Sequence, residues 1–301
     1  MRYVWVGLFW LLPLSAANAL EIQKVTDNVY ALVGELAQRS PTNLGNNATF
    51  GVVITDDGVV LIDPGGSWKG AAAIDDAISS LTDQPVKYVI NSGGQDHRWI
   101  GNSYWQAKGA TVIASSAAVA DHRDRGSQQM SGLDFLIGEA LDGTQPSYAD
   151  ITFDTDHSFD LGGTTFEIYF RGQAHTPGDS YIWVPSESTV FTGDIVYTER
   201  ILGVGEQSHS GDWITVFEAM AELDADHVVP GHGRATDMLT ATADTYDYLV
   251  NLRGVMGEYM DGGGEIIDSV NVDQSHFSYL AQFDQLAKRN AQQVFSEMEF
   301  E

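Results

Sequence analysis

Four short apolar runs in this sequence each end in a turn of small residues that contains one histidine or aspartate. These residues are His97 in NSGGQDHRW, His175 in GQAHTPGD, Asp194 in FTGD and His232 in VVPGHG. Loops that follow strands commonly present binding residues on a rigid scaffold, and a neighbouring glycine lets the backbone turn tightly beside a bound group. The pattern favours a fold in which the ends of several strands meet at one site.

The order of strand-like and helix-like segments predicts two halves of similar design. In the first half, strands are expected at 28–34, 48–55, 58–63, 86–91 and 111–115. Asp56-Asp57-Gly58 is a hairpin turn signal, and helical spacing follows over 68–82. Residues 116–148 mix helical spacing with Gly and Pro breaks, so we expect a lid or a wall over a pocket there.

The second half begins again with strands and ends in helices. Strands are expected at 164–170, 180–185, 188–194 and at the start of 226–233, and helices at 212–223, 237–260 and 278–298. This order predicts an α/β (α+β) fold of two packed mixed sheets with outer helices. No shift in composition marks a boundary, so we expect one domain over residues 20–301.

The first residues have the three parts of a secretory signal peptide. Arg2 precedes an apolar run, and Ala17-Asn18-Ala19 fits the small-x-small pattern before a cleavage site. We expect residues 1–19 to be removed, and an uncleaved N-terminal anchor is the alternative. No later stretch is apolar enough to span a bilayer, so we expect a periplasmic or secreted mature chain without a membrane span.

Charge and cysteine content narrow the partners and the sources of stability. The formal net charge is −27, and such a field repels polyanions. We therefore expect a small-molecule substrate and no nucleic acid. The chain has no cysteine, so an exported form gains no disulfide, and packing or a bound metal must stabilise it.

The residue types in the four turns suit a divalent metal ion. Neutral imidazole and carboxylate are the ligands expected of Zn²⁺ and related ions. A lone histidine after a strand is more often a hydrogen-bonded structural residue, but four such residues after four strands favour a metal site. Other histidines give weaker signals; His122, in ADHRDRG, is expected at a solvated helix end.

The order of five motifs resembles that of the metallo-β-lactamase superfamily. The motifs are GVVLIDPGG, YVINSGGQDHRWIGN, AHTPGDS, VFTGDIV and VVPGHG, and the last three match the family in type, order and spacing. The resemblance covers nearly all of residues 20–301. It implies an αββα sandwich with one or two metal ions, usually zinc, at one edge of the sheets. It also implies that Asp63 supports the metal loop and is not a ligand.

The first metal loop departs from the family pattern His-x-His-x-Asp-His. Without gaps, Gly93 and Gln95 fall at the first two histidine positions, with His97 at the aspartate and Arg98 at the last histidine. A frame shifted by one residue instead keeps Asp96 and His97 as the Asp-His pair. The ungapped alignment needs neither a deletion nor an insertion, so we prefer it.

Both alignments imply one ion held by His97, Asp194 and His232, with a position left open for water. They differ over whether Gln95 or Asp96 faces the metal, and His175 becomes a ligand if a second ion binds. The candidate metal ligands are therefore His97, Asp194, His232, His175, Gln95 and Asp96.

Together with these residues, the resemblance implies an exported metal-dependent hydrolase of a small ester, lactone, thioester, sulfate ester or amide. A zinc ion, with iron or manganese as alternatives, lowers the pKa of a bound water toward about 7, which makes hydroxide available. His175 is expected to carry a proton, and Arg98 to replace a second metal or hold an anionic substrate group. Trp99, Trp213 and Tyr197 are candidate pocket residues. The alternative is a non-catalytic, metal-free binding protein that keeps the fold.

Overall fold

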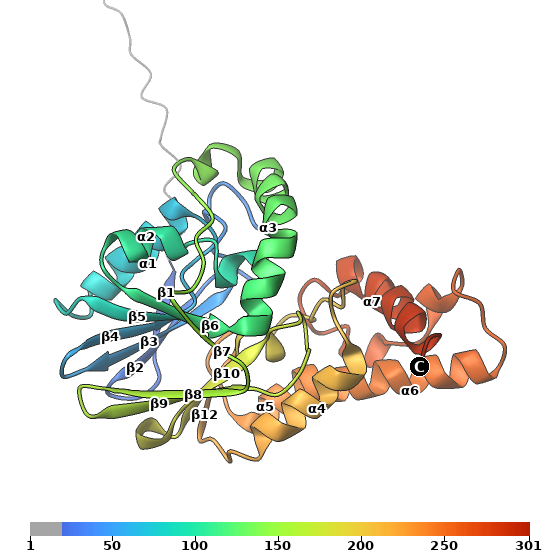
Figure 1. Ribbon diagram of the computed structural model, residues 1–301. Helices are drawn as coiled ribbons and strands as arrows, with labels where there is room; N and C mark the ends of the chain where they lie inside the picture. The colour runs from blue at the N-terminus through green and yellow to red at the C-terminus, as the bar shows by residue number, and fades with distance from the viewer. Residues whose placement is uncertain (1–19) are drawn as a thin grey trace, which may run out of the picture.

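Helices cover the outer faces of two stacked β-sheets in residues 20–301, the part of the chain that the computed structural model describes (Figure 1). The predicted signal peptide, residues 1–19, lies outside the described residues. The predicted sandwich of two mixed sheets with outer helices is confirmed. Within residues 20–301, no helix is both long and apolar enough to cross a membrane.

The first sheet has seven strands, and their spatial order follows the sequence. Strands β1 to β4 pair antiparallel, and β4 to β7 pair in parallel. A helix connects each parallel pair, as parallel strands require. The strands are β1 (Glu21–Lys24), β2 (Val29–Val33), β3 (Thr49–Thr55), β4 (Gly58–Ile62), β5 (Val86–Asn91), β6 (Thr111–Ser115) and β7 (Ile151–Phe153).

The second sheet has five strands in the order β12-β11-β10-β9-β8. Only the β11–β12 pair is parallel, and helix α4 makes that connection. The strands are β8 (Asp156–Leu161), β9 (Thr164–Phe170), β10 (Ser180–Val184), β11 (Thr189–Phe191) and β12 (His227–Val229).

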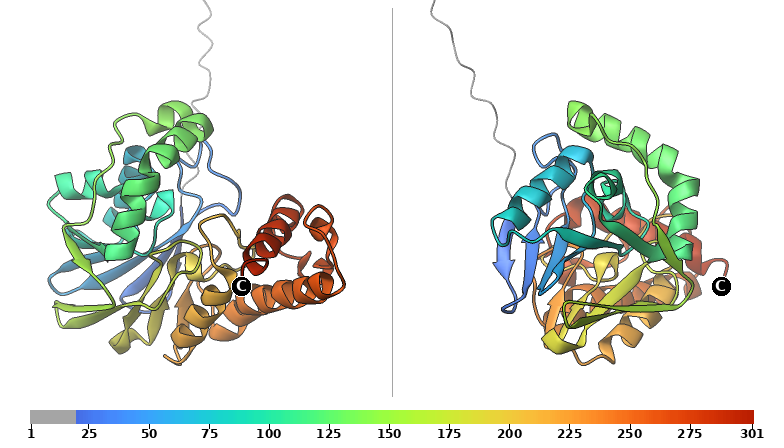
Figure 2. Two further views of the ribbon diagram at one scale, coloured as in Figure 1. Left: turned by 45° about the vertical axis from the view of Figure 1, so that its right-hand side comes forward. Right: turned by 60° about the vertical axis from the view of Figure 1, so that its left-hand side comes forward.

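Seven α-helices surround the two sheets in the described chain. They are α1 (Trp68–Ser79), α2 (Asn102–Ala107), α3 (Ser116–Ile137), α4 (Ser210–Ala221), α5 (Met238–Ala241), α6 (Asp247–Asp261) and α7 (Phe283–Met298). A short π-helical turn at 242–246 joins α5 to α6. Helix α7 packs against α6 at the end of the molecule away from β1 to β4 (Figure 2).

Alternating side chains on the strands explain why two sheets stack. Successive residues of a strand point to opposite faces. In β4, Val60 and Ile62 join the core between the sheets, whereas Val59 and Leu61 pack beneath α1 and α2. All four side chains are buried, so β4 is apolar on both faces. Burial on both faces follows from the position of β4, which has the second sheet on one side and helices on the other.

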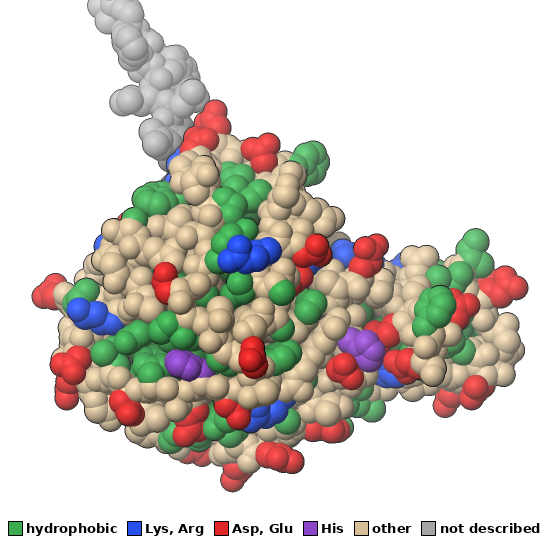
Figure 3. Space-filling model, in the orientation of Figure 1, with side chains coloured by type: hydrophobic (Ala, Val, Ile, Leu, Met, Phe, Trp, Pro, Cys, Tyr) green, Lys and Arg blue, Asp and Glu red, His purple; other side chains and the backbone are tan. Residues whose placement is uncertain are grey.

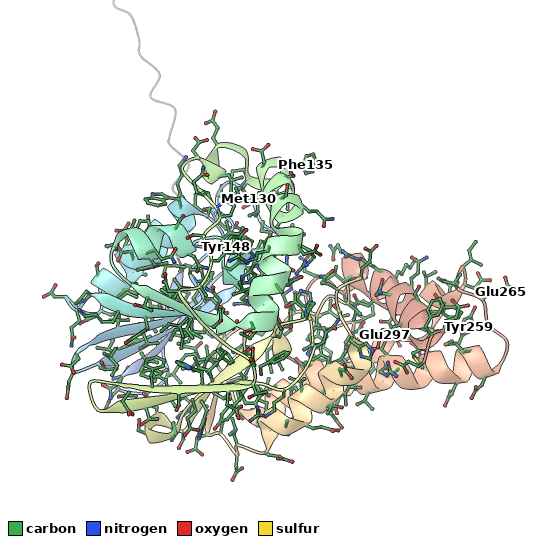
Figure 4. The ribbon with its side chains drawn as sticks, in the orientation of Figure 1. Met130, Phe135, Tyr148, Tyr259, Glu265 and Glu297 are labelled. Atoms are coloured by element: carbon green, nitrogen blue, oxygen red, sulfur yellow. The ribbon has the colours of Figure 1, made fainter. Side chains whose placement is uncertain are left out.

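Helix α3 forms a wall behind the loop that follows β5. Leu133 of α3 packs with Trp99 of that loop, and the partly buried Met130 and Tyr148 lie against the same cluster (Figure 4). Phe135 points away from the molecule and is 89% exposed. The segment therefore supports the loop from behind, which agrees with the predicted wall and not with a lid.

Candidate metal centre and its pocket

The loop between β5 and α2 is held in place by buried polar contacts. Ser92 donates hydrogen bonds from its backbone N and its Oγ to Asp63, each at 2.8 Å. Side chains of other segments fill the space beside the two glycines, since a Cβ on Gly93 would collide with Asp179, and one on Gly94 with Asp121 of helix α3. The loop then makes a short 3₁₀ turn, Asp96–Arg98, which presents His97.

Three of the predicted ligands converge from separate parts of the chain. Asp194 lies in the 3₁₀ turn after β11, and His232 follows β12. Nε2 of His97 lies 3.4 Å from Oδ2 of Asp194, and Nε2 of His232 lies 3.3 Å from Oδ1. All three side chains are buried, and they form a group that could hold a metal ion.

The spacing of these atoms is compatible with a metal ion. Tetrahedral bonds of about 2.0–2.2 Å place neighbouring ligand atoms about 3.3–3.6 Å apart, and each imidazole lies within this range of one Asp194 oxygen, His97 of Oδ2 and His232 of Oδ1. Nε2 of His97 is buried and has no hydrogen-bond partner. Buried polar atoms are rarely left without a partner, so an ion bound to Nε2 would satisfy it.

Asp96 supports His97 from behind and does not join the ligand group. Its carboxylate accepts a hydrogen bond from the His97 backbone N at 2.7 Å, forms an ion pair with Arg39, and lies 3.2 Å from Nδ1 of His97. Arg39 also lies 2.9 Å from that Nδ1. A metal-bound histidine usually donates its other N–H to a carboxylate or carbonyl; Asp96 offers that acceptor, but Arg39, which can only donate, competes for the same Nδ1 from a shorter distance.

The environment of His232 fits a metal less closely. Its Nδ1 faces Nη1 of Arg200 at 3.4 Å. A guanidinium group has only donors, so it cannot accept the Nδ1–H that a metal-bound neutral imidazole carries. Tyr197 stacks on the His232 ring, with 4.6 Å between centroids.

Arg98 is a buried link between two carboxylates and not a pocket residue. Its guanidinium donates to Asp63 at 2.8 Å and to both oxygens of Asp194 at 2.8 and 3.2 Å. It also donates to the carbonyls of Thr49 and Gly231. Burial opposes ionisation of Asp194, but Arg98 and His97 outweigh it and hold its pKa well below the usual value. The fully enclosed Arg98 is not placed to hold a substrate group, contrary to that expectation.

A small pocket of about 160 Å³ opens beside the three converging residues. Gln95, His97, His175 and His232 line it, whereas Asp96 does not. This placement agrees with the ungapped alignment of the metal loop. Further lining residues are Gln38, Arg39, Tyr197, Arg200, Gly203, Gly205, Gln207, Leu286 and Arg289.

His175 is held in one tautomer at the pocket wall. Its Nδ1 lies 2.9 Å from the carbonyl oxygen of Gly203, which can only accept, so Nδ1 carries the proton and Nε2 keeps its lone pair. Burial lowers the pKa of His175 to about 4, although the charge of Asp194 opposes this. The imidazole is therefore neutral near pH 7 and can accept a proton or act as a ligand.

Two aromatic candidates lie outside the pocket, and one histidine differs from its prediction. Trp99 and Trp213 are fully buried and do not line the pocket, whereas Tyr197 does.

The prediction that His122 lies at a solvated helix end is wrong, since its side chain is buried. It stacks on Trp99 at 4.5 Å and contacts the Gly93 carbonyl at 3.0 Å. Burial lowers its pKa to about 4.

A second cluster of metal-ligating residue types has another partner. His209, Glu297 and Glu301 lie close together. Arg253 donates to Glu297 at 2.9 Å and to Glu301 at 2.6 Å, so one guanidinium group already pairs with both carboxylates.

The sequence profile described as the metallo-beta-lactamase superfamily matches residues 44–232. A metallo-beta-lactamase type 2 from Elizabethkingia meningoseptica is 24% identical over 238 residues, 76% of this chain and 85% of the relative. The structure of a metallo-beta-lactamase from Pontibacter korlensis matches with a TM-score of 0.63 at 22% identity, over 77% of this chain and 99% of that one.

The stereoselective inverting sec-alkylsulfatase Pisa1 from Pseudomonas sp. matches with a TM-score of 0.72 at 17% identity. The match covers 93% of this chain and 50% of the alkylsulfatase chain. A match over 93% of 301 residues must include most of the chain after His232. The likeness to the alkylsulfatase fold therefore extends into the C-terminal helices.

Proposed function

Because this chain belongs to the metallo-β-lactamase superfamily, we propose that it is a metal-dependent hydrolase of a small molecule. His97, Asp194 and His232 would hold one ion, with zinc as the first candidate and iron or manganese as alternatives. His175 and Gln95 line the same pocket and would serve as ligands if a second ion binds.

The observation that supports this proposal most strongly is the unpartnered Nε2 of His97. That atom is buried and lies 3.4 Å from Asp194. Two imidazoles and one carboxylate also make a common catalytic ligand set, which leaves a position open for water. The weaker fit at His232 supports the alternative, a metal-free binding protein, and metal content separates the two.

The chain's own residues supply the remaining chemistry. When bound, the ion would act as a Lewis acid and lower the pKa of water. His175 presents the lone pair of Nε2 to the pocket and can take a proton there, and its pKa of about 4 makes it a weak base near pH 7. Tyr197 stays protonated, because burial and Asp194 raise its pKa well above the usual value. Its hydroxyl is directed at Asp194 and would help to hold that carboxylate beside the ion.

The size and surroundings of the pocket limit the substrate. The volume of about 160 Å³ belongs to a pocket that is open to solvent and continues into a groove at Gln207 and Arg289, so it limits only the part of the substrate next to the candidate metal centre. We propose a small ester, lactone, thioester, sulfate ester or amide. The likeness to an alkylsulfatase, which includes the C-terminal helices, supports keeping sulfate esters in this set. The altered metal loop, with Gly93 and Gln95 at histidine positions, argues against a β-lactam substrate.

We propose that the protein acts in the periplasm or outside the cell. The sequence of residues 1–19 has the pattern of a signal peptide. Fractionation of cells that express the full chain, with mass determination of the product, should find a chain beginning at Leu20 outside the cytoplasm. Full-length protein in the cytoplasm would contradict this proposal.

Metal analysis of His97→Ala tests the proposed centre. Untagged wild-type protein should purify with about one equivalent of zinc, iron or manganese, and it should hydrolyse at least one of an aryl ester, a thioester, a lactone and an aryl sulfate. His97→Ala should lose both the metal and the activity. His276→Ala, the same change at an exposed histidine, should keep both.

Two outcomes would contradict the proposed enzyme. In the first, wild-type protein contains no metal, and its melting temperature does not rise when zinc, iron or manganese is added. This outcome would favour the metal-free binding protein. The other is His97→Ala with full metal content, which would show that the ion lies elsewhere.

A further inference from the structure

The pocket beside the candidate metal centre contains positive charge that no carboxylate of residues 20–301 neutralises. Nine of the fourteen Lys and Arg residues in this range form ion pairs with Asp or Glu. Of the five that form none, Arg200 and Arg289 line the pocket. Lys87, Arg123 and Lys288 are exposed, and Arg123 lies over the Tyr148 ring.

Arg200 differs from the other unpaired cations because it is partly buried. Its Nε is buried and has no hydrogen-bond partner, and its Nη1 has only the long 3.4 Å contact with His232. Burial, with the nearby charge of Arg39, lowers the pKa of Arg200. Burying a cation without a partner is costly, so an anion in the pocket would relieve this cost.

The backbone holds Arg200 in register with the segment that precedes α7. Ala281 N donates to Glu199 O at 2.9 Å, and Ile201 N donates to Ala281 O at 3.0 Å. Glu199 and Gln282, on the two sides of this contact, have φ values of 62° and 65°. Left-handed backbone at residues other than glycine costs free energy, and such strain clusters at functional sites.

Helix α7 brings the second cation to the pocket. Leu286 and Arg289 are three residues apart, so they lie on one face of the helix, and both line the pocket. Both lie beyond residue 232, where the match to the family profile ends. An adjoining groove shares Gln207 and Arg289 with the pocket, and Glu206 is its one lining carboxylate in the described chain.

The local charge balance is positive even though the whole chain is strongly acidic. Arg39, Arg200 and Arg289 line the pocket, and no Asp or Glu of the described chain does. Asp96 pairs with Arg39, and the buried Asp63 and Asp194 pair with Arg98, which leaves the charges of Arg200 and Arg289 without an ion-pair partner. A positive pocket in a chain of net charge −27 is a selective place for a small anion.

We propose that Arg200 and Arg289 bind a negatively charged group of the substrate, a carboxylate or a sulfonate, next to the bond that is cleaved. Arg200 contacts Nδ1 of His232, whereas Nε2 of that ring faces Asp194. The anionic group therefore lies about one imidazole width from the reacting centre. This favours an anionic ester, thioester, lactone or amide over a sulfate ester, whose charge is on the reacting group itself.

The substrate assay rests on the proposed hydrolase function and compares two esters of equal length. These are mono-para-nitrophenyl glutarate, which is anionic, and para-nitrophenyl valerate, which is neutral. Wild-type protein should prefer the glutarate ester in kcat/KM by about tenfold or more. Arg200→Gln should reduce this preference about tenfold, and the more exposed Arg289→Gln about threefold. Lys288→Gln removes the same charge from the neighbouring residue of α7 and should leave the preference unchanged.

A binding assay tests the same two arginines without catalysis. Calorimetry should detect binding of benzenesulfonate and not of methyl phenyl sulfone, its neutral analogue. Binding should weaken about tenfold in Arg200→Gln and with rising salt. If this pattern holds but neither ester is hydrolysed, the anion subsite stands and the proposed hydrolase fails. Hydrolysis of both esters at equal rates, with no benzenesulfonate binding, overturns the subsite and leaves the hydrolase intact.

Discussion

Arg98 is a buried cation that joins two buried carboxylates beneath the pocket. It donates to Asp63 and to both oxygens of Asp194, and its side chain is fully buried. Removing one member of a buried ion pair leaves an uncompensated charge, which typically costs about 3–5 kcal/mol. Arg98 therefore contributes by holding two anionic side chains close together.

We expect Arg98→Met to lower the free energy of unfolding by about 3–5 kcal/mol. Arg98→Lys keeps the positive charge but lacks the planar guanidinium group that contacts both carboxylates and two carbonyls. We therefore expect it to lower the free energy of unfolding by less than Arg98→Met does. Urea unfolding monitored by tryptophan fluorescence measures both. As a control, Arg234→Met removes an exposed partner of Glu21 and should leave the unfolding midpoint nearly unchanged. Equal stability of Arg98→Met and wild type would contradict this account.

At the scale of elements, the loop between β5 and α2 packs its glycines closely against side chains of other elements. The space beside Gly93 is occupied by Asp179, which accepts hydrogen bonds from the backbone N and the Oγ1 of Thr176. Burial, together with the charge of Asp194, raises the pKa of Asp179 to about 8. The loop that contains Gly93 therefore packs closely against the segment that contains Asp179. A side chain at position 93 would have to displace Asp179.

We expect Gly93→Ala to destabilise the protein by about 1–3 kcal/mol, because its Cβ would collide with the Asp179 carboxylate. Gly132→Ala is the matched control, since Gly132 is exposed in the middle of α3 and a Cβ there meets nothing. That control should gain up to about 1 kcal/mol from helix propensity. Thermal unfolding of both variants measures the difference, and a stable Gly93→Ala would show that Asp179 moves aside freely.

At the scale of the whole molecule, acidic charge dominates the surface. Asp and Glu total 42 residues against 15 Lys and Arg. Figure 3 shows acidic side chains spread over the visible face, with fewer basic ones between them. Like charges repel one another in the compact state, so part of the free energy of folding is lost to self-repulsion.

Salt should therefore stabilise this protein. Raising sodium chloride from about 0.02 to 0.3 M shortens the screening length well below the diameter of the molecule. We expect a gain of about 1–2 kcal/mol, or roughly 2–8 °C in melting temperature. Circular dichroism can follow the transition, and tetramethylammonium chloride at equal ionic strength should give a similar gain. A melting temperature that falls with both salts would show that attractive ion pairs outweigh the repulsion.

The sequence by itself determined most of the strands and the turns that contain the candidate ligands, whereas β1, β7 and β8 were not predicted. The predicted bounds of β5, β6 and β9 agree with the structure, and the Asp56-Asp57-Gly58 turn joins β3 to β4. These features depend on local patterns, namely alternation of apolar residues and turn-forming glycines. The turns that contain His97, Asp194 and His232 could be predicted for the same reason, since each directly follows a strand-like run.

Only the tertiary structure decided what surrounds these residues. Arg39, Arg200 and Arg289 lie at the pocket, yet no motif marks them, and they come from a loop, a turn and a C-terminal helix. The burial of Arg98 and of His122 likewise depends on distant segments that close over them. A local pattern fixes the direction of a side chain relative to its own strand or helix, whereas its partners, solvent exposure and charge environment depend on how separate elements pack.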